Sequence, residues 1–78
     1  MTIKTIGLDL AKNVFQLHGV DGSGNMVLRR SLRRTHVAAF FAQLPPCVIG
    51  MESCSSSQYW ARKLAALGHQ TRSSRRNL

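Results

Sequence analysis

The stretch Ile3-Lys-Thr-Ile-Gly-Leu-Asp-Leu10 alternates apolar and polar side chains and contains several β-branched residues. A period of two is typical of a strand that buries one face in a core. Asp9 lies near the carboxyl end of this stretch, and a turn is expected at residues 11–13. We therefore predict a strand over residues 3–10 that carries an acidic side chain at its end.

Two further strands are predicted over residues 14–20 and 26–32, where apolar and β-branched side chains recur. The sequence Asp21-Gly-Ser-Gly-Asn25 separates them and is typical of a tight turn between strands. Consecutive strands joined by such short links pair in the antiparallel sense. The first three strands are thus expected to form an antiparallel meander.

The apolar period lengthens to that of a helix after Thr35, a residue type that caps helix N-termini. The expected core stripe of this helix consists of Val37, Phe40, Phe41 and Leu44. Pro45-Pro46 should end the helix, since proline cannot continue it. The continuous apolar run Cys47-Val-Ile-Gly-Met51 then predicts a short strand that is buried on both faces.

A serine-rich loop at residues 53–57 precedes a second helical pattern, which Gly68 should terminate. The apolar stripe of this helix consists of Trp60, Leu64 and Leu67, and its alternative caps are Ser55, Ser56 and Ser57. A fifth strand begins near His69 and gives way to a polar basic tail over residues 73–78. The order β-β-β-α-β-α predicts an α/β domain, over residues 1–72, with a mixed sheet covered by helices.

Two acidic residues, Asp9 and Glu52, each lie at the carboxyl end of a predicted strand. A helical crossover after the meander can place the fourth strand parallel to the first and beside it, at a spacing of about 4.8 Å. The two carboxylates would then repel each other unless a cation or a proton lies between them. Hard oxygen ligands suit Mg²⁺ or Mn²⁺, which can activate water for phosphodiester cleavage.

Structural roles remain open for both acids. Asp9 has the chemistry to open the turn that follows it, and Glu52 would interact favourably with the N-terminus of the next helix. From spacing alone, the metal site and these structural roles stand as alternatives.

The charge of the 78-residue chain is strongly positive, because eleven Lys and Arg residues face three acids for a net charge of +8. This imbalance favours polyanionic partners, nucleic acid first and anionic membrane second. Candidate nucleic-acid contacts are Lys12, Arg29, Arg30, Arg33 and Arg34. The alternative for the four arginines is a solvated basic strand edge that discourages aggregation.

No signal peptide and no apolar run of about 20 residues is found in the sequence, so a cytoplasmic protein without a membrane partner is expected. Cys47 and Cys54 are then expected to be reduced thiols. Their separation of seven residues is not that of a metal knuckle.

Several linked motifs between Thr2 and Arg72 together resemble one protein family. These motifs are Ile6-Gly-Leu-Asp9-Leu-Ala-Lys-Asn-Val-Phe-Gln-Leu-His18, Phe40-Phe-Ala-Gln-Leu-Pro-Pro46, Gly50-Met-Glu52-Ser-Cys54, Trp60-Ala-Arg62 and Leu67-Gly-His69. The family is the insertion-sequence transposases with a DEDD, RuvC-like catalytic domain. The resemblance implies a ribonuclease-H-like fold and four acids that hold divalent metal for DNA strand cleavage and transfer.

By motif, Asp9 resembles the first of these acids and Glu52 the second. The resemblance also implies DNA as substrate, an element-encoded structured RNA, a homo-oligomer, and a separate C-terminal domain with a nucleophilic serine. The last two acids and that serine domain have no counterpart in this sequence, and the residues after Arg72 depart from the family pattern. The chain is therefore expected to be an N-terminal fragment, truncated or frameshifted at 73–78, that is inactive alone.

Two other functions compete with this one. Actin-like and sugar-kinase-type ATPases also open with a Gly-x-Asp strand, but they continue into a Gly-Thr-type turn, where this chain has Ala11-Lys12-Asn13. A small nucleic-acid-binding protein without enzymatic activity would also agree with the charge.

Overall fold

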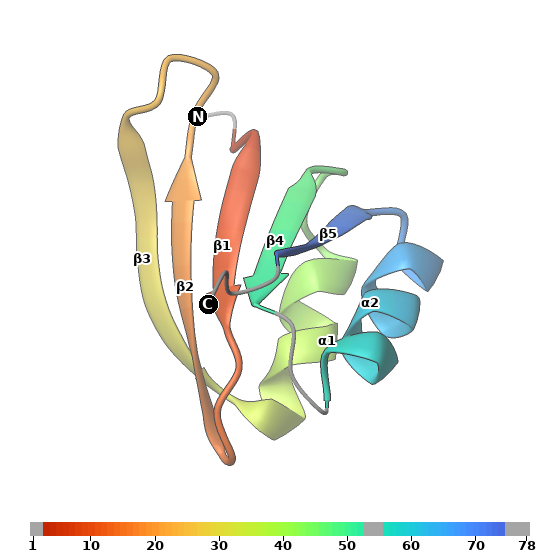
Figure 1. Cartoon of the computed structure of the whole chain (residues 1–78). Coiled ribbons are helices and arrows are strands. Elements are labelled where there is room, and N and C mark those ends of the chain that lie inside the picture. Colours follow the sequence, from red (N-terminus) through yellow and green to blue (C-terminus); the bar gives the residue numbers. More distant parts are fainter. Residues whose placement is uncertain (1–2, 53–55, 75–78) are drawn as a thin grey trace.

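The computed structural model describes residues 3–52 and 56–74. Its elements are β1 (Thr5–Asp9), β2 (Val14–Val20), β3 (Met26–Arg33), α1 (Arg34–Ala42), β4 (Val48–Glu52), α2 (Ser57–Ala66) and β5 (Gln70–Ser74). The strands form one five-stranded sheet in the order β3-β2-β1-β4-β5 (Figure 1). The predicted α/β domain with a mixed sheet is thus confirmed.

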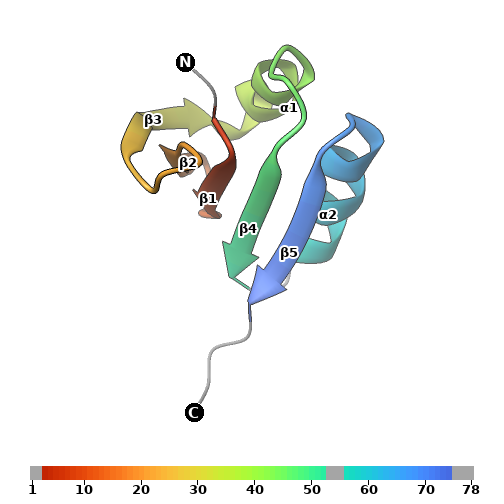
Figure 2. The same ribbon diagram turned by 90° about the horizontal axis from the view of Figure 1, so that it is seen from above.

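The pairing of the strands follows from the length of their connections. β1, β2 and β3 are joined by short turns and pair antiparallel. The crossover through α1 brings β4 parallel to β1, with Leu8 opposite Met51, and the crossover through α2 brings β5 parallel to β4. Figure 2 shows β4 and β5 side by side, with α2 along β5.

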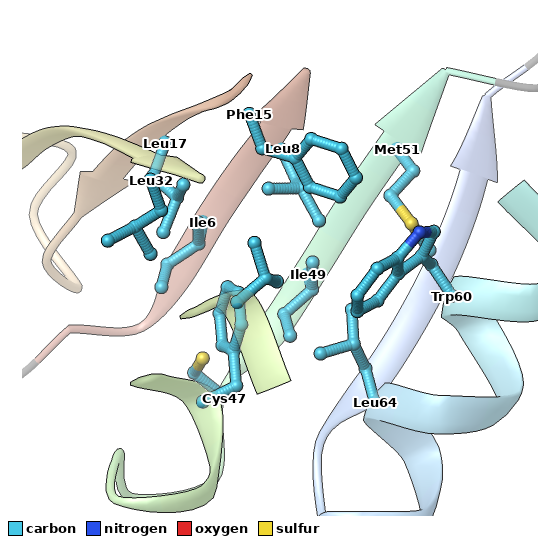
Figure 3. Close-up of a cluster of buried hydrophobic side chains, with 12 residues drawn as sticks. Ile6, Leu8, Phe15, Leu17, Leu32, Cys47, Ile49, Met51, Trp60 and Leu64 are labelled. Atoms are coloured by element: carbon cyan, nitrogen blue, oxygen red, sulfur yellow. The ribbon is translucent and has the colours of Figure 1, made fainter. Parts of the chain in front are cut away.

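The core lies on one face of this sheet. Alternate residues of β1, β2 and β4 are buried there, and α1 and α2 cover them with Val37, Phe41, Trp60 and Leu64. The ring of Phe15 meets that of Trp60 edge to face, with centroids 5.2 Å apart. Figure 3 shows side chains of the strands and of α2 converging in this cluster. Both predicted helical stripes therefore face the core.

The opposite face of the sheet, which we call the open face, carries the other set of alternate residues. The prediction that β4 is buried on both faces was wrong, because both helices pack on the same side. Ile49 and Met51 are buried, whereas Val48 and Gly50 are half-buried and Glu52 is exposed.

The N-terminus of α1 also differs from the prediction. The helix begins at Arg34, and the N-cap position belongs to Arg33, which makes no side-chain capping hydrogen bond. The N–H of Arg34 donates instead to the carbonyl oxygen of Asn13 at 2.8 Å. The predicted cap Thr35 therefore lies inside the first turn of the helix, one residue after its start.

The second helix agrees with its predicted signals. Ser56, one of the three proposed caps, occupies the N-cap position of α2 but makes no side-chain capping hydrogen bond. Gly68 follows the C-cap with φ of +97°, a conformation that glycine adopts without strain. Ser55 and Cys54 lie outside the described residues.

Strand β5 extends further than the sequence indicated. Its register with β4 runs from Gln70 opposite Val48 to Ser74 opposite Glu52. Residues 73 and 74, assigned to the tail by their polarity, therefore belong to the sheet, since strand pairing uses backbone groups. Residues 75–78 of that predicted tail lie outside the described residues.

Candidate metal centre

Asp9 and Glu52 are the last residues of the neighbouring parallel strands β1 and β4. The registered pairs end with Leu8 opposite Met51, so the two acids come next on their strands. Parallel neighbours lie about 4.8 Å apart. Leu8 and Met51 point into the core, and Asp9 and Glu52 are exposed on the open face. The structure thus brings the two predicted acids together at one edge of the sheet.

Both acids line an open depression of about 300 Å³. Its lining consists of Gly7, Leu8, Asp9, His18, Gly50, Met51 and Glu52. The two glycines lie opposite each other in the register of β1 and β4, below the acids. His18 lies in β2 beside Gly7.

Two carboxylates at neighbouring strand ends suit a hard divalent cation in their ligand type. Among residues 3–52 and 56–74, no group of three or more His, Cys, Asp and Glu side chains could hold a metal ion. The third acid of the whole sequence is Asp21, which lies in the β2–β3 turn. Asp9 pairs with Gln16 near the start of β2, whereas Asp21 follows the end of that strand. This chain therefore offers two carboxylates to such an ion.

The predicted basic contacts divide between two faces. In β3, Arg29 pairs with His18 and Arg33 pairs with Val14, which places both arginines on the open face. Arg30 points to the opposite face, where its Cζ lies 5.3 Å from the ring centroid of Phe40. β3 is an edge strand, so both the phosphate-contact and the protective-edge interpretations remain consistent with its position.

A second basic group lies near the acidic end of the sheet. Arg33 and Arg34 line an open depression of about 470 Å³ together with residues 13, 14 and 35. Lys12 is exposed in the β1–β2 turn that connects Asp9 to this region. Lys12, Arg33 and Arg34 thus lie at the same end of the sheet as the two acids.

His69 is a buried polar residue that the sequence did not single out. Its Nδ1 accepts a hydrogen bond from the N–H of Cys47 at 3.2 Å, so its Nε2–H donates to the carbonyl oxygen of Phe41 at 2.7 Å. Burial raises the pKa of the Cys47 thiol, which lies 3.6 Å from Nδ1. Since a raised thiol pKa opposes nucleophilic chemistry, this pair is structural. Cys47 and His69 are 22 residues apart, so no local sequence pattern indicates that they are in contact.

Neither of the two described helices combines the length and the apolar character needed to cross a bilayer.

Comparison with known proteins gives consistent matches to transposases. A protein of Pseudomonas aeruginosa named "Probable family 20 transposase" is 57% identical over 72 residues, which is 92% of this chain and 21% of that protein. Transposases for insertion sequence elements of Yersinia enterocolitica and Coxiella burnetii are 40% and 35% identical over 70 and 69 residues. The chain belongs to the insertion-sequence transposases. The predicted resemblance to insertion-sequence transposases is thus confirmed.

The matched region covers 90% and 88% of this chain in the latter two cases, but 21% and 19% of those relatives. The chain therefore spans about a fifth of the length of the curated transposases it matches. No family model matches the chain. No solved structure matches it either.

Proposed function

We propose that this transposase segment contributes the first two metal ligands, Asp9 and Glu52, of a catalytic domain for DNA strand cleavage and transfer. One observation carries the proposal: the two acids end adjacent parallel strands and line the same depression. The transposase relatives support DNA as the substrate. They also favour this function over the ATPase alternative.

The ribonuclease-H-like fold is part of this proposal. It rests on the motifs that resemble the DEDD transposases. The mixed sheet agrees with it, since three antiparallel strands are followed by a helix and by a fourth strand parallel to β1. In such a site the carboxylates of Asp9 and Glu52 would hold Mg²⁺ or Mn²⁺ against the substrate phosphate. The ion, when bound, supplies Lewis acidity and a water of lowered pKa.

The four-acid arrangement implied by the resemblance exceeds what these 78 residues contain, because Asp21 is their only other acid and lies at the far end of β2. The remaining acids and the nucleophilic serine would come from other parts of the longer transposases. We therefore expect the purified chain to bind metal weakly and to leave DNA uncleaved.

The basic residues at the acidic end of the sheet fit a role in holding nucleic acid. Lys12, Arg33 and Arg34 are exposed there and would neutralise phosphates, so that binding falls steeply with salt. Arg29 adds a positive charge on the open face. An element-encoded RNA and a homo-oligomer are further parts of the proposal, and both rest on the resemblance alone.

Paramagnetic line broadening by Mn²⁺ tests the metal site directly. In ¹H–¹⁵N spectra of the 78-residue chain, substoichiometric Mn²⁺ should first broaden the amide signals of residues near the ends of β1 and β4. Asp9→Asn should remove this local broadening, and Asp21→Asn, a matched change of one charge at the other end of β2, should preserve it. Broadening that is uniform over the surface, or unchanged in Asp9→Asn, would refute the metal site.

A further inference from the structure

Two glycines occupy facing positions in the two central strands of the sheet. Gly7 of β1 lies opposite Gly50 of β4, and both are on the open face, away from the helices. Glycine in the interior of a strand weakens it, because its backbone is flexible and it has no side chain to pack. Two such residues side by side at the centre of a sheet therefore call for a physical reason.

The packing of the chain itself does not provide that reason. A Cβ built on Gly50 would meet no atom within 4 Å, and one built on Gly7 would meet only the carbonyl oxygen of His18 at 3.8 Å. Gly19 differs, because its Cβ would lie 2.9 Å from the Cβ of Leu28. A glycine inside a strand often marks a bulge, a bend or the close approach of a ligand or another backbone. The register is regular at Gly7 and Gly50, which favours close approach.

Two arginines and a histidine lie beside these glycines on the open face. Following the register across the open face, the row reads Arg29, His18, Gly7, Gly50 and Arg72. His18 and Arg72 thus flank the two glycines on β2 and β5, three strand spacings or about 14 Å apart. Both side chains are exposed. The two glycines and His18 line the same open depression as Asp9 and Glu52, and Arg72 lies next to Gly50 on β5.

The acids lie one row further along the same face. Asp9 is two residues beyond Gly7, and Glu52 is two residues beyond Gly50, which corresponds to about 6–7 Å along the strands. An anion above the glycines would therefore be attracted by Arg72, could accept a hydrogen bond from the imidazole of His18, and could extend toward a cation held by the acids. A polymer with repeated negative charges could contact Arg72 and His18 with one phosphate and a cation held by the acids with another.

We propose that Gly7 and Gly50 form the floor of a groove for a single nucleic-acid strand, whose phosphodiester groups Arg72 and His18 contact. This inference rests on the proposed nucleic-acid function and deepens it by naming the path of the strand. The missing side chains let the sugar–phosphate backbone lie against the sheet. The strand then runs along β1 and β4 toward Asp9 and Glu52.

The test is the affinity of the 78-residue chain for fluorescent single strands, measured by anisotropy without divalent metal. Matched DNA and RNA oligomers serve as two arms, because they share the phosphodiester backbone. Gly50→Val places a β-branched side chain in the open space above the two glycines. Arg72→Gln removes the positive charge next to Gly50. Arg62→Gln is the matched control, since Arg62 is exposed on α2, on the helical side of the sheet.

Arg72→Gln should weaken binding by about tenfold and lower the slope of log affinity against log salt by about 1. Gly50→Val should weaken binding at least as much while its thermal midpoint stays equal or rises. Arg62→Gln should bind like the wild type. Binding of either oligomer supports the groove. The oligomer that binds more tightly shows whether the groove prefers deoxyribose or ribose.

Three results would overturn the proposal: no binding by the wild type, unchanged affinity of Gly50→Val, or equal losses for Arg72→Gln and Arg62→Gln. If Gly50→Val fails to fold, the comparison of the affinities of Arg72→Gln and Arg62→Gln is sufficient to test the proposal. Arg72→Gln separates this inference from the metal site, because it should weaken metal-free strand binding and preserve the local Mn²⁺ broadening near the ends of β1 and β4. Failure of the metal test with a positive groove test would remove only the metal site.

Discussion

The Nε2–H of His69 donates a hydrogen bond of 2.7 Å to the carbonyl oxygen of Phe41, which ties the residue before β5 to the end of α1. The other ring nitrogen accepts the N–H of Cys47, just before β4. One neutral imidazole thereby connects three segments that are distant in sequence. The ring also meets that of Phe41 edge to face, with centroids 5.5 Å apart.

Replacing His69 by Ala should therefore destabilise the chain by about 2–4 kcal/mol. The substitution leaves the buried N–H of Cys47 without its partner, which costs about 1–3 kcal/mol. The carbonyl oxygen of Phe41 keeps the N–H of Leu44 at 3.3 Å, but the lost edge-to-face contact with the Phe41 ring adds about 0.5–1.5 kcal/mol. Urea unfolding followed by circular dichroism measures this loss. His36→Ala, at an exposed position of α1, is the control and should change stability by less than about 0.5 kcal/mol. Equal effects of the two substitutions would contradict the structural role of His69.

Two glycines in the same sheet should respond oppositely to alanine. Gly19→Ala brings a Cβ to 2.9 Å from the Cβ of Leu28 and to 3.3 Å from Cγ2 of Ile3, so strands must shift. We expect a loss of about 1–3 kcal/mol, the usual cost of overpacking. Gly50→Ala meets open space and should stabilise by about 0.5–1 kcal/mol, because it restricts the unfolded chain. Chemical denaturation of both variants checks the contrast, and destabilisation by Gly50→Ala would contradict it.

Arg29 and Arg30 are neighbours in β3 that should have separable effects. Arg29 lies on the open face and should contact phosphate, so Arg29→Gln should lower the salt slope of oligonucleotide binding by about 1 and leave stability unchanged. Arg30 lies over Phe40, and Arg30→Gln should cost about 0.5–1 kcal/mol of stability through the lost cation–π contact. Anisotropy titrations at several salt concentrations, with thermal melts of both variants, distinguish the two roles. Similar behaviour of the variants would refute this division.

Local patterns in the sequence were sufficient for much of this fold. The period of two in β1 identified which residues are buried, and the turn at residues 21–25 implied the antiparallel hairpin. The crossover argument also placed Asp9 beside Glu52, since a single helix between parallel strands leaves few arrangements. These features depend on short-range chemistry and on simple connection rules.

Features that depend on distant contacts were missed or misjudged. β5 was cut short because the polarity of Ser73 and Ser74 suggested a tail, although backbone pairing with β4 determines a strand. The predicted cap Thr35 lies inside α1, because the helix begins at Arg34, whose N–H donates to the carbonyl oxygen of the distant residue Asn13. The facing of Gly7 and Gly50 required the register of β1 with β4, which no local pattern contains.

The turn between β2 and β3 should make stability depend on acid pH. The Asp21 carboxylate accepts the N–H groups of Ser23 at 2.9 Å and of Asn25 at 3.0 Å. The hydrogen bond from Asn25 is the main cause that lowers the pKa of Asp21 below its ordinary value of 3.8. Because the folded state favours the charged form, the contribution is fully present above the unfolded pKa and is lost as pH falls through the lower folded pKa.

The thermal midpoint of the wild type should therefore exceed that of Asp21→Ala by a constant amount above about pH 5, and this difference should shrink toward pH 2. The two proteins share every other side chain, so the effects of pH on the rest of the chain cancel in the difference. Asp21→Asn is the informative second variant, because its amide oxygen can still accept both N–H groups without a titrating charge. Its midpoint should exceed that of Asp21→Ala by an amount that does not change with pH. If the wild type also kept a constant advantage over Asp21→Ala down to pH 2, the ionised carboxylate would not be what stabilises the turn.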